Sequence, residues 1–294
     1  MDISQFGFET TAEEVTSGLD LTGKTYVVTG CNSGLGLETT RVLGMRGGHV
    51  IGAARTREKA AAAIASTGVE GTPVVCELSD AASVRACAAE IRGLGRPIDA
   101  LICNAGIMAL PEPRTTHGLD LQFLTNHIGH FILVTELLDS LAEDGRVVVL
   151  SSGAHHMAPE AGIEFDNLSG ARDYKPWKMY GQSKLANILF TKELAKRLAG
   201  SRRTANALHP GVIRTNLARH LDDAEALLST LKLKSVPQGA ATQCLVAVHP
   251  ALAGTSGEYF ADCQLKETHP HAQDAELAAR LWARSEEIVA RLTS

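Results

Sequence analysis

The sequence KTYVVTGCNSGLG at residues 24–36 joins a short β-branched run to a turn that contains three glycines. The run predicts a buried strand, and the residues after the turn predict a helix. Gly30 would allow the tight turn, Gly34 would let the backbone approach a pyrophosphate, and Gly36 would let the helix pack closely on the strand. The free N–H groups at the helix start favour an anion there. The stretch therefore predicts a dinucleotide-binding turn, with a purely structural turn as the alternative.

Outward from this turn, apolar runs alternate with helical patterns along the chain. The expected strands are residues 24–29, 49–54, 73–77, 98–103, 146–151, 204–208 and 257–260. The expected helices are residues 34–46, 57–66, 80–92, 119–141, 180–199 and 238–248. Continuous apolar strands that alternate with helices are typical of a parallel sheet covered on both faces. We expect an α/β chain: a single-domain Rossmann fold over residues 21–294, with a doubly wound seven-stranded parallel sheet, after an N-terminal extension at residues 1–20.

The composition is that of an ordinary globular protein, with 294 residues, 45% hydrophobic and 21% charged residues, and a net charge of -5. No basic block indicates a nucleic-acid partner, and no apolar run is long enough for a membrane segment. The first 20 residues lack the pattern of a signal peptide, so we expect a cytoplasmic location. The six cysteines form no CxxC pair and are expected to be buried and reduced.

The end of the second expected strand bears on the choice of coenzyme. An acidic residue about 20 positions beyond the glycines would bind the ribose 2′-OH of NAD. This sequence instead has AARTR at residues 53–57, and its first carboxylate there is Glu58. Arg55 is placed to pair with a 2′-phosphate, which favours NADP(H) and leaves NAD(H) as the second choice. The alternative for Arg55 is a solvated surface arginine.

A tyrosine and a lysine four residues apart begin the helix expected at residues 180–199. Tyr180 and Lys184 would lie on one helical face. A nearby ammonium favours the phenolate and would lower the pKa of the tyrosine, which suits the pair to moving a proton to or from a carbonyl oxygen. A surface pair is the usual alternative, so this motif carries weight only beside the glycine turn.

Small or polar residues follow three other expected strands. They are Ser151-Ser152, Asn104-Ala105-Gly106 and Pro210-Gly211. Ligands of a doubly wound sheet bind at the carboxyl ends of its strands, so these residues are expected to face one crevice.

Together these residues resemble the short-chain dehydrogenase/reductase family. The matching pieces, in family order, are TGCNSGLG (29–36), NAG (104–106), NHIGHF (126–131), Ser152, YGQSK (180–184) and HPG (209–211). Within the family the chain is most similar to retinol dehydrogenases and WW-domain oxidoreductase-like enzymes, through NHIGHFILVTELL, SSGAHH and YGQSKLANILFTKEL. Such members often prefer NADP(H), which agrees with the interpretation of Arg55.

The resemblance implies a catalytic tetrad. Tyr180 would be the general acid and base, and Lys184 would adjust the pKa of Tyr180 and hold the nicotinamide ribose. Ser152 would orient the substrate oxygen, and Asn126 would hold a water that connects Lys184 to solvent. The implied coenzyme-binding residues are Gly30, Asn32, Ser33, Gly34, Leu35, Gly36, Arg55, Glu77, Leu78, Asn104, Ala105, Gly106, Tyr180, Lys184, Pro210, Gly211, Val212 and Thr215. One departure is Glu77, which stands where the family usually has an aspartate that contacts adenine.

The expected function is therefore hydride transfer between NADP(H) or NAD(H) and a small-molecule carbonyl or alcohol. The resemblance also implies a homodimer or homotetramer built through the helices at residues 119–141 and 180–199. Two other functions stay open: an NADP(H)-sensing protein without turnover, and a lyase or epimerase on the same scaffold. Residues 216–236 are leucine-rich and predict a mobile lid over an apolar substrate, with a rigid helical pair as the alternative. The histidines near the site are expected to be structural or to line the substrate, and no metal site is expected.

Overall fold

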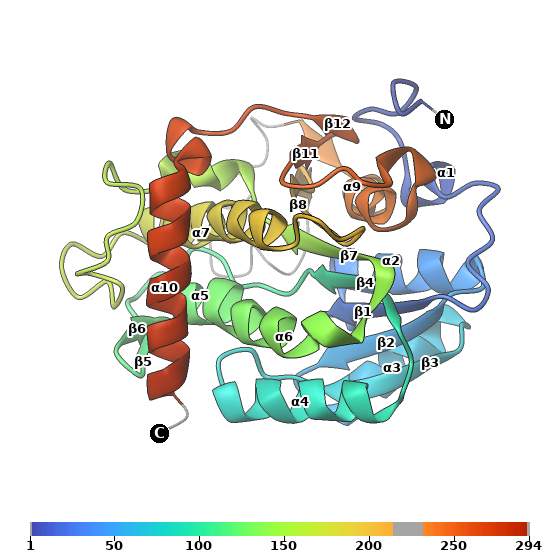
Figure 1. Cartoon of the computed structure of the whole chain (residues 1–294), viewed down its shortest axis with the longest axis horizontal. Coiled ribbons are helices and arrows are strands. Elements are labelled where there is room, and N and C mark those ends of the chain that lie inside the picture. The colour runs from blue at the N-terminus through green and yellow to red at the C-terminus, as the bar shows by residue number, and fades with distance from the viewer. Residues whose placement is uncertain (1, 214–231, 293–294) are drawn as a thin grey trace.

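The computed structural model describes residues 2–213 and 232–292, and it has a central sheet with helices on both faces (Figure 1). The strands lie in the order β12-β11-β8-β7-β4-β1-β2-β3. Their bounds are β1 Thr25–Thr29, β2 His49–Ala54, β3 Gly71–Val75, β4 Ile98–Cys103, β7 Leu141–Leu150, β8 Thr204–His209, β11 Tyr259–Ala261 and β12 Gln264–Leu265. The main helices are α2 Gly34–Met45, α3 Arg57–Thr67, α4 Ala81–Gly93, α6 Gly129–Leu137, α7 Pro176–Arg197, α9 Val236–Val248 and α10 Ala275–Arg291.

The sheet reverses its direction of growth between β1 and β4. From β1 the chain first adds β2 and β3 on one side, and it then returns to place β4 on the other side of β1. All of these neighbours pair in parallel, for example with Val28 opposite Gly52 on β2 and Ile102 on β4. In open α/β sheets ligands bind outside the carboxyl ends of the strands at such a reversal, so the glycine turn after β1 lies at the expected place.

The seven predicted parallel strands are confirmed, and an eighth strand extends the sheet. β12 pairs antiparallel with β11 at the edge, with Phe260 opposite Leu265. Two residues are too short to give an alternating pattern, which is why the sequence did not predict this strand. β7 also begins at Leu141 rather than at the predicted Arg146, and its register against β4 shifts between Ile98 and Ala100.

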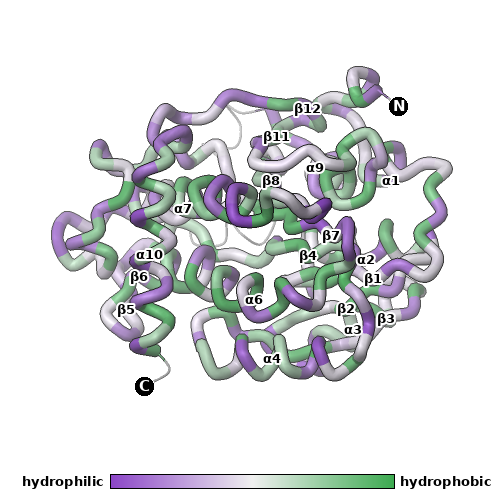
Figure 2. Tube along the Cα trace, in the orientation of Figure 1, coloured by the Kyte–Doolittle hydropathy of each residue, from purple (hydrophilic) through white to green (hydrophobic). Residues whose placement is uncertain are grey.

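Two apolar cores lie on opposite faces of the sheet. Val27 packs with the core under α4, α6, α7 and α10, whereas its neighbour Val28 packs with the core under α2, α3 and α9. Successive side chains of a strand point to opposite faces, so a strand buried on both sides must be apolar at every position. Figure 2 shows the result, with hydrophobic strands inside and a mixed pattern on the outer helices.

The C-terminal helix α10 covers part of α6 and α7. The Trp282 ring lies nearly parallel to the Phe190 ring, with 5.6 Å between the ring centroids, and it meets Phe131 edge-on at 4.9 Å. The Arg197 guanidinium lies over the same Trp282 ring, 4.1 Å from its centroid. The surface through which we expected two copies to associate is thus partly occupied by the chain's own helix, and the oligomeric state stays a prediction.

The long helix predicted at residues 119–141 is interrupted. β6 (Leu119–Asp120) is followed by a short helix α5 (Leu121–Phe123), a π-helical turn (Leu124–Ile128) and α6. Asp120 caps α5 by accepting from the N–H groups of Gln122 and Phe123 at 3.0 and 3.1 Å. A π turn adds a residue and shifts the phase of the helix, but residues 122–134 are buried on every side, so no apolar stripe shows the shift. Such turns are frequent at functional sites.

The first turn of α6 packs against the chain after β3. A Cβ added to Gly129 would lie 2.9 Å from the Cβ of Leu78, and closer still to the carbonyl oxygen of Leu78. This contact holds the π turn beside the carboxyl end of β3.

The N-terminal extension packs on the body of the molecule. It contains a four-residue helix, α1 (Ala12–Val15), whose Ala12 and Val15 are buried in the same core as α9. Gln264 of β12 donates to the carbonyl oxygens of Ile3 and Phe6, both at 2.7 Å.

The extension also contacts the chain just before α9. Phe8 lies under the ammonium groups of Lys232 and Lys234, which are 3.9 and 4.8 Å from its ring centroid. Lys234, whose side chain is fully buried, pairs with Asp262 at 2.8 Å, and Lys232 pairs with Glu9 at 3.0 Å. Lys234 belongs to β10 (Leu233–Lys234), which pairs in parallel with β9 (Val212–Ile213).

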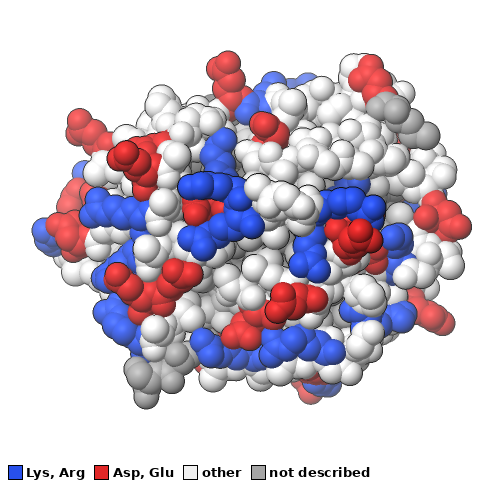
Figure 3. Space-filling view, in the orientation of Figure 1, with Lys and Arg blue, Asp and Glu red and all other residues white. Residues whose placement is uncertain are grey.

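The surface carries charges of both signs. On the face shown in Figure 3, Lys and Arg side chains alternate with Asp and Glu. None of the helices in residues 2–213 and 232–292 has the length and apolar character needed to cross a membrane. The six cysteines, all within these ranges, are buried free thiols.

Candidate active site

The glycine turn leaves the start of α2 open. Gly30 and Gly34 have φ angles of +69° and +53°, which favour glycine. A Cβ on Gly36 would lie 2.6 Å from Asn104 Nδ2 and closer still to the Gly30 carbonyl oxygen, so α2 meets β1 more closely than a side chain allows. Ser33, the N-cap residue, forms no side-chain hydrogen bond with the helix. The first N–H groups of α2 are thus left without a cap, as a pyrophosphate site requires.

Other helices of the same sheet contrast with α2. Side chains of Thr56, Asp80, Ser235 and Asp274 cap α3, α4, α9 and α10. Asn32 and Ser33 are exposed, and Leu35 is half-buried. α7 also begins without a side-chain cap, at Pro176, so it is the open helix start together with the glycines that distinguishes the turn before α2. These residues fit a dinucleotide.

Arg55 lies at the carboxyl end of β2 with its side chain exposed. No side chain in the described part of the chain pairs with it. The neighbouring Arg57, in contrast, donates to both carboxylate oxygens of Glu90 at 2.9 Å. Glu77, at the end of β3, accepts from the N–H and hydroxyl of Ser79 at 3.1 and 2.8 Å. Arg55 is thus the cation that remains available beside the glycine turn.

The turn at residues 104–106 is bonded to the end of β1. Asn104 Nδ2 donates to the Thr29 carbonyl at 2.8 Å, and the N–H groups of Asn104 and Ala105 donate to the Thr29 hydroxyl at 2.9 and 3.0 Å. A Cβ on Gly106 would lie 3.1 Å from Asn126 Oδ1. The coenzyme turn and Asn126 are therefore joined through this segment.

Tyr180 and Lys184 lie on one face of α7, and both are buried. The Lys184 Nζ donates to the Leu150 carbonyl at 3.0 Å and lies 5.7 Å from the centroid of the Tyr180 ring. Ser151 Oγ donates to the Lys184 carbonyl at 2.7 Å, which fixes α7 against the end of β7. Ser152 follows directly, so the structure brings Ser152, Tyr180 and Lys184 together.

Burial sets the protonation of this pair. Loss of solvent raises the pKa of Tyr180 to about 12, and a hydrogen bond with Ser152 opposes that rise. Loss of solvent lowers the pKa of Lys184 to about 8. The expected lowering of the Tyr180 pKa by Lys184 is therefore wrong for this structure, because desolvation of the phenolate is the dominant effect.

The side-chain amide of Asn126 makes its hydrogen bonds within the protein. Its Oδ1 accepts from the Ile107 N–H, and its Nδ2 donates to the Ile107 carbonyl and the Ser183 hydroxyl, all at 2.9 Å. It lies in the π turn and clamps the segment after Gly106 to α7. The water role implied for Asn126 would therefore fall to its backbone carbonyl rather than to its side chain.

The remaining predicted residues lie around β8. Pro210 and Gly211 follow this strand, and Val212 begins β9. Gly211 has a φ angle of +99°, and a Cβ there would lie 2.7 Å from the Lys234 side chain. Thr215 and residues 216–231 of the expected lid lie outside the described residues.

Sequence reasoning missed two residues that organise this site. Thr29 binds the turn at residues 104–106, and Ser183 joins Asn126 to the Tyr180 carbonyl, to which it donates at 2.7 Å. In the sequence, the feature that could have identified Thr29 is its hydroxyl side chain directly before Gly30. Just before Tyr180, Met179 is fully buried, and Trp177 meets the Tyr180 ring edge-on at 6.0 Å.

The histidines near the site serve as hydrogen-bond partners. His155 Nδ1 donates to the Ser152 carbonyl at 2.7 Å, and His127 Nε2 lies 2.9 Å from the Ser285 hydroxyl. Among the described residues, no three His, Cys, Asp or Glu side chains converge as a metal site would need.

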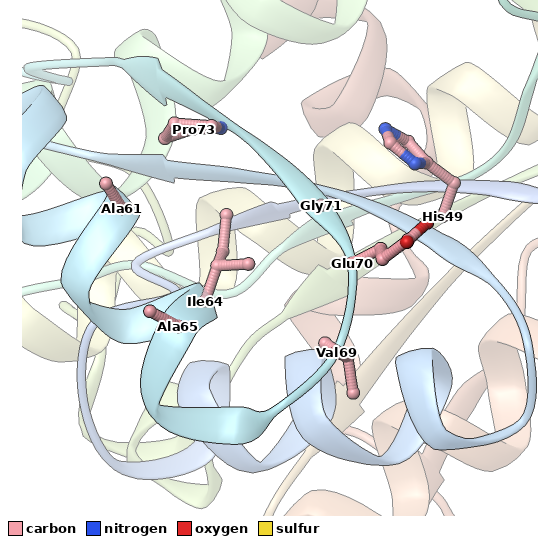
Figure 4. Close-up of a pocket in the computed structure, with 8 residues that line it drawn as sticks. All are labelled: His49, Ala61, Ile64, Ala65, Val69, Glu70, Gly71 and Pro73. Atoms are coloured by element: carbon pink, nitrogen blue, oxygen red, sulfur yellow. The ribbon is translucent and has the colours of Figure 1, made fainter.

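A shallow hollow of about 470 Å³ lies far from this site. Figure 4 shows its lining, which comes from the end of α3 and the amino ends of β2 and β3, including His49, Ile64 and Gly71. Because it is at the opposite end of these strands from the glycine turn, it is not part of the candidate active site.

Comparisons with known proteins agree with this geometry. A family model described as short chain dehydrogenase matches residues 24–165. The chain is 42% identical over 297 residues to short-chain dehydrogenase TIC 32 B, chloroplastic, of Brassica napus, with 95% of this chain and 92% of the relative covered. It is 41% identical over 285 residues to retinol dehydrogenase 13 of Homo sapiens, with 91% and 85% covered.

A solved structure of similar sequence is an uncharacterized protein from Mycobacterium Paratuberculosis. It is 36% identical, has a TM-score of 0.78, and the match covers 94% of this chain and 97% of that one. The resemblance inferred from the motifs is thereby confirmed over nearly the whole length. The chain belongs to the short-chain dehydrogenase family of oxidoreductases.

Proposed function

We propose that the protein interconverts a carbonyl and an alcohol on a small molecule, prefers NADP(H), and uses Tyr180 as the proton donor and acceptor. The observation that carries the proposal is the group formed by half-buried Ser152 with buried Tyr180 and Lys184, at the sheet edge where the glycine turn opens. A protein that only sensed the coenzyme would have no use for a proton-transfer group there, and no feature of the described residues favours a lyase or an epimerase.

The residues divide the chemistry between them. The nicotinamide, when bound, supplies or accepts the hydride. A carbonyl oxygen that receives a hydride gains negative charge, and a proton donor within hydrogen-bond reach stabilises it. Because burial holds the pKa of Tyr180 near 12, its phenol is protonated at neutral pH and can donate directly. In the reverse direction the base is the deprotonated form of Tyr180: its phenolate oxygen, which the nearby Lys184 ammonium stabilises, takes the alcohol proton.

Arg55 supports the preference for NADP(H). A planar guanidinium suits a phosphate, and a charge-assisted bond of this kind is stronger than a neutral one. The side chain is exposed and unpaired within the described residues, while Arg57 is held by Glu90. Orienting Arg55 toward a 2′-phosphate would therefore break no existing ion pair.

The test is turnover of NADPH with a panel of aldehydes, ketones and quinones by wild type and Tyr180→Phe. The variant keeps the ring and removes the transferable proton, so we expect turnover to fall by about 10²–10⁴-fold while NADPH binding stays close to wild type. Tyr26→Phe is the matched control, since Tyr26 is a buried tyrosine on β1 away from the site, and it should keep wild-type turnover. Near-normal turnover by Tyr180→Phe would overturn the proposal.

A further inference from the structure

His130, in the first turn of α6, joins the coenzyme turn to the π turn. Its Nδ1 lies 3.1 Å from the Asn126 carbonyl oxygen, and its Nε2 lies 2.9 Å from the Thr29 hydroxyl. The ring is fully buried. Asn126 lies one turn earlier in the same helical segment, whereas Thr29 is on β1, so one ring contacts two parts of the candidate site that are far apart in the sequence.

The chemistry of the partners fixes the tautomer of His130. A carbonyl oxygen can only accept, so Nδ1 carries the proton and Nε2 must accept from the Thr29 hydroxyl. Burial also lowers the pKa of His130 to about 4, which keeps the ring neutral near pH 7.

The Thr29 hydroxyl then has a complete set of partners. Its oxygen accepts from the N–H groups of Asn104 and Ala105, and its single proton goes to His130. The result is a directed chain of hydrogen bonds from the turn at residues 104–106, through Thr29 and His130, to the carbonyl of Asn126.

We propose that His130 is a positioning residue: it sets the Asn126 backbone, and through Asn126 the segment at Ile107 and Ser183, relative to the glycine turn. The expected effect of His130 on turnover rests on the proposed function, whereas its expected effect on the Asn126 backbone does not. Asn126 binds both the N–H and the carbonyl of Ile107 and the Ser183 hydroxyl. A shift of Asn126 would therefore be passed to both neighbours of Lys184: Ser183, which precedes it in α7, and the segment at Gly106 and Ile107, where a Cβ on Gly106 would lie 3.6 Å from the Lys184 Nζ.

The two ends of His130 are not equivalent. If Nε2 is lost, the Thr29 hydroxyl has a second acceptor nearby, the Ile102 carbonyl at 3.4 Å. On the side of the π turn, the only hydrogen bond of the His130 ring to the described residues is the one from Nδ1 to the Asn126 carbonyl. We therefore infer that the bond to Asn126 carries the positioning effect.

Three variants separate these contributions. His130→Phe keeps a ring and removes both bonds. His130→Asn places an amide N–H where Nδ1 stands and keeps the donor to Asn126. His130→Gln can place its amide oxygen where Nε2 stands and keep the acceptor for Thr29.

The first readout is the exchange rate of the Ile107 amide with deuterium, measured by NMR on the full chain below the melting temperature. We expect His130→Phe and His130→Gln to speed this exchange by about five- to tenfold, the factor that corresponds to one hydrogen bond. His130→Asn should stay close to wild type. Unchanged exchange in His130→Phe, or equal exchange in His130→Asn and His130→Gln, would overturn the proposal even if no substrate is known.

The second readout is kcat, KM and NADPH affinity with the best carbonyl substrate. Displacement of a positioned group by about 1 Å can cost on the order of 10²-fold in rate, so kcat of His130→Phe should fall by up to that factor, with NADPH affinity nearly unchanged and rescue by His130→Asn. A variant that melts at a lower temperature but keeps wild-type kcat would reduce His130 to a stability role and refute the proposal. Absence of turnover in wild type would instead sink the proposed function and leave the exchange result to decide on His130.

Discussion

Replacement of Gly36 by alanine tests the fit of α2 to the coenzyme turn. The added Cβ would lie 2.6 Å from Asn104 Nδ2 and closer still to the Gly30 carbonyl oxygen, whereas relaxed contacts between heavy atoms begin near about 3.5 Å. The overlap is therefore roughly 1 Å or more, and one of the two neighbours is backbone that cannot rotate away. The start of α2 must move away from β1.

Two magnitudes follow from that movement. Overpacking of this kind costs about 1–3 kcal/mol, while alanine gains up to about 1 kcal/mol over glycine in a helix. The free energy of unfolding should thus fall by up to about 3 kcal/mol. Loss of one hydrogen bond to a charged group costs about 1.5–3 kcal/mol. We therefore expect NADPH binding to Gly36→Ala to weaken by about ten- to hundredfold.

A matched substitution isolates the cause. Gly93 is the last residue of α4, has ordinary helical backbone, and nothing lies within 4 Å of an added Cβ. Gly93→Ala should leave NADPH binding unchanged and should raise the free energy of unfolding by up to about 1 kcal/mol. Thermal melts and NADPH titrations by fluorescence would measure both quantities. Wild-type NADPH affinity in Gly36→Ala, with a melting temperature equal to that of Gly93→Ala, would refute the reasoning.

Four further outcomes are expected. Arg55→Ala should weaken NADPH binding much more than NADH binding in titrations, while Arg57→Ala should change neither; equal losses for both coenzymes in Arg55→Ala would show that this residue does not contact the phosphate. Burial lowers the pKa of Lys184 to about 8, so the Lys184 charge is lost as the pH rises through that value, and kcat/KM should fall on the alkaline side. Lys184→Arg stays charged, so the same alkaline fall in that variant would assign the fall to another group. Phe8→Ala should lower the free energy of unfolding in urea by about 1–2 kcal/mol, because the ring contacts the buried ammonium of Lys234; an unchanged urea midpoint would mean that the extension adds no stability. Light scattering at micromolar concentration should give a mass of two or four chains, and a single-chain mass would contradict the expected assembly.

The sheet could be predicted because its strands satisfy one simple requirement. Residues such as Val27 and Val28 face opposite cores, so strands buried on both faces read as continuous apolar runs. The glycine turn was predictable for a related reason, since only glycine meets both the φ angle at Gly30 and the close approach at Gly36. Local chemistry at these positions leaves few alternatives.

The features that could not be predicted depend on contacts between distant segments. The π turn around Asn126 lies in a segment that is buried on every side, so the sequence has no apolar stripe whose shift would reveal the extra residue. His130 is indistinguishable from any core histidine until β1 places Thr29 beside it. The pKa of Tyr180 was expected to fall because its partner Lys184 is visible in the sequence, while the burial that raises it is not.

The buried cysteines make the protein easy to probe chemically. Burial raises the pKa of Cys31 and Cys263 to about 11 and that of Cys244 to about 12, so in the folded state these thiols are both shielded and protonated. In the unfolded chain a thiol has a pKa near about 8.5, and its thiolate reacts readily with an alkylating agent. At pH 8, iodoacetamide should therefore leave the folded protein unmodified and mark each molecule that opens. Mass spectrometry of the alkylated sites would then show which parts of the sheet separate first when the protein is heated or mutated.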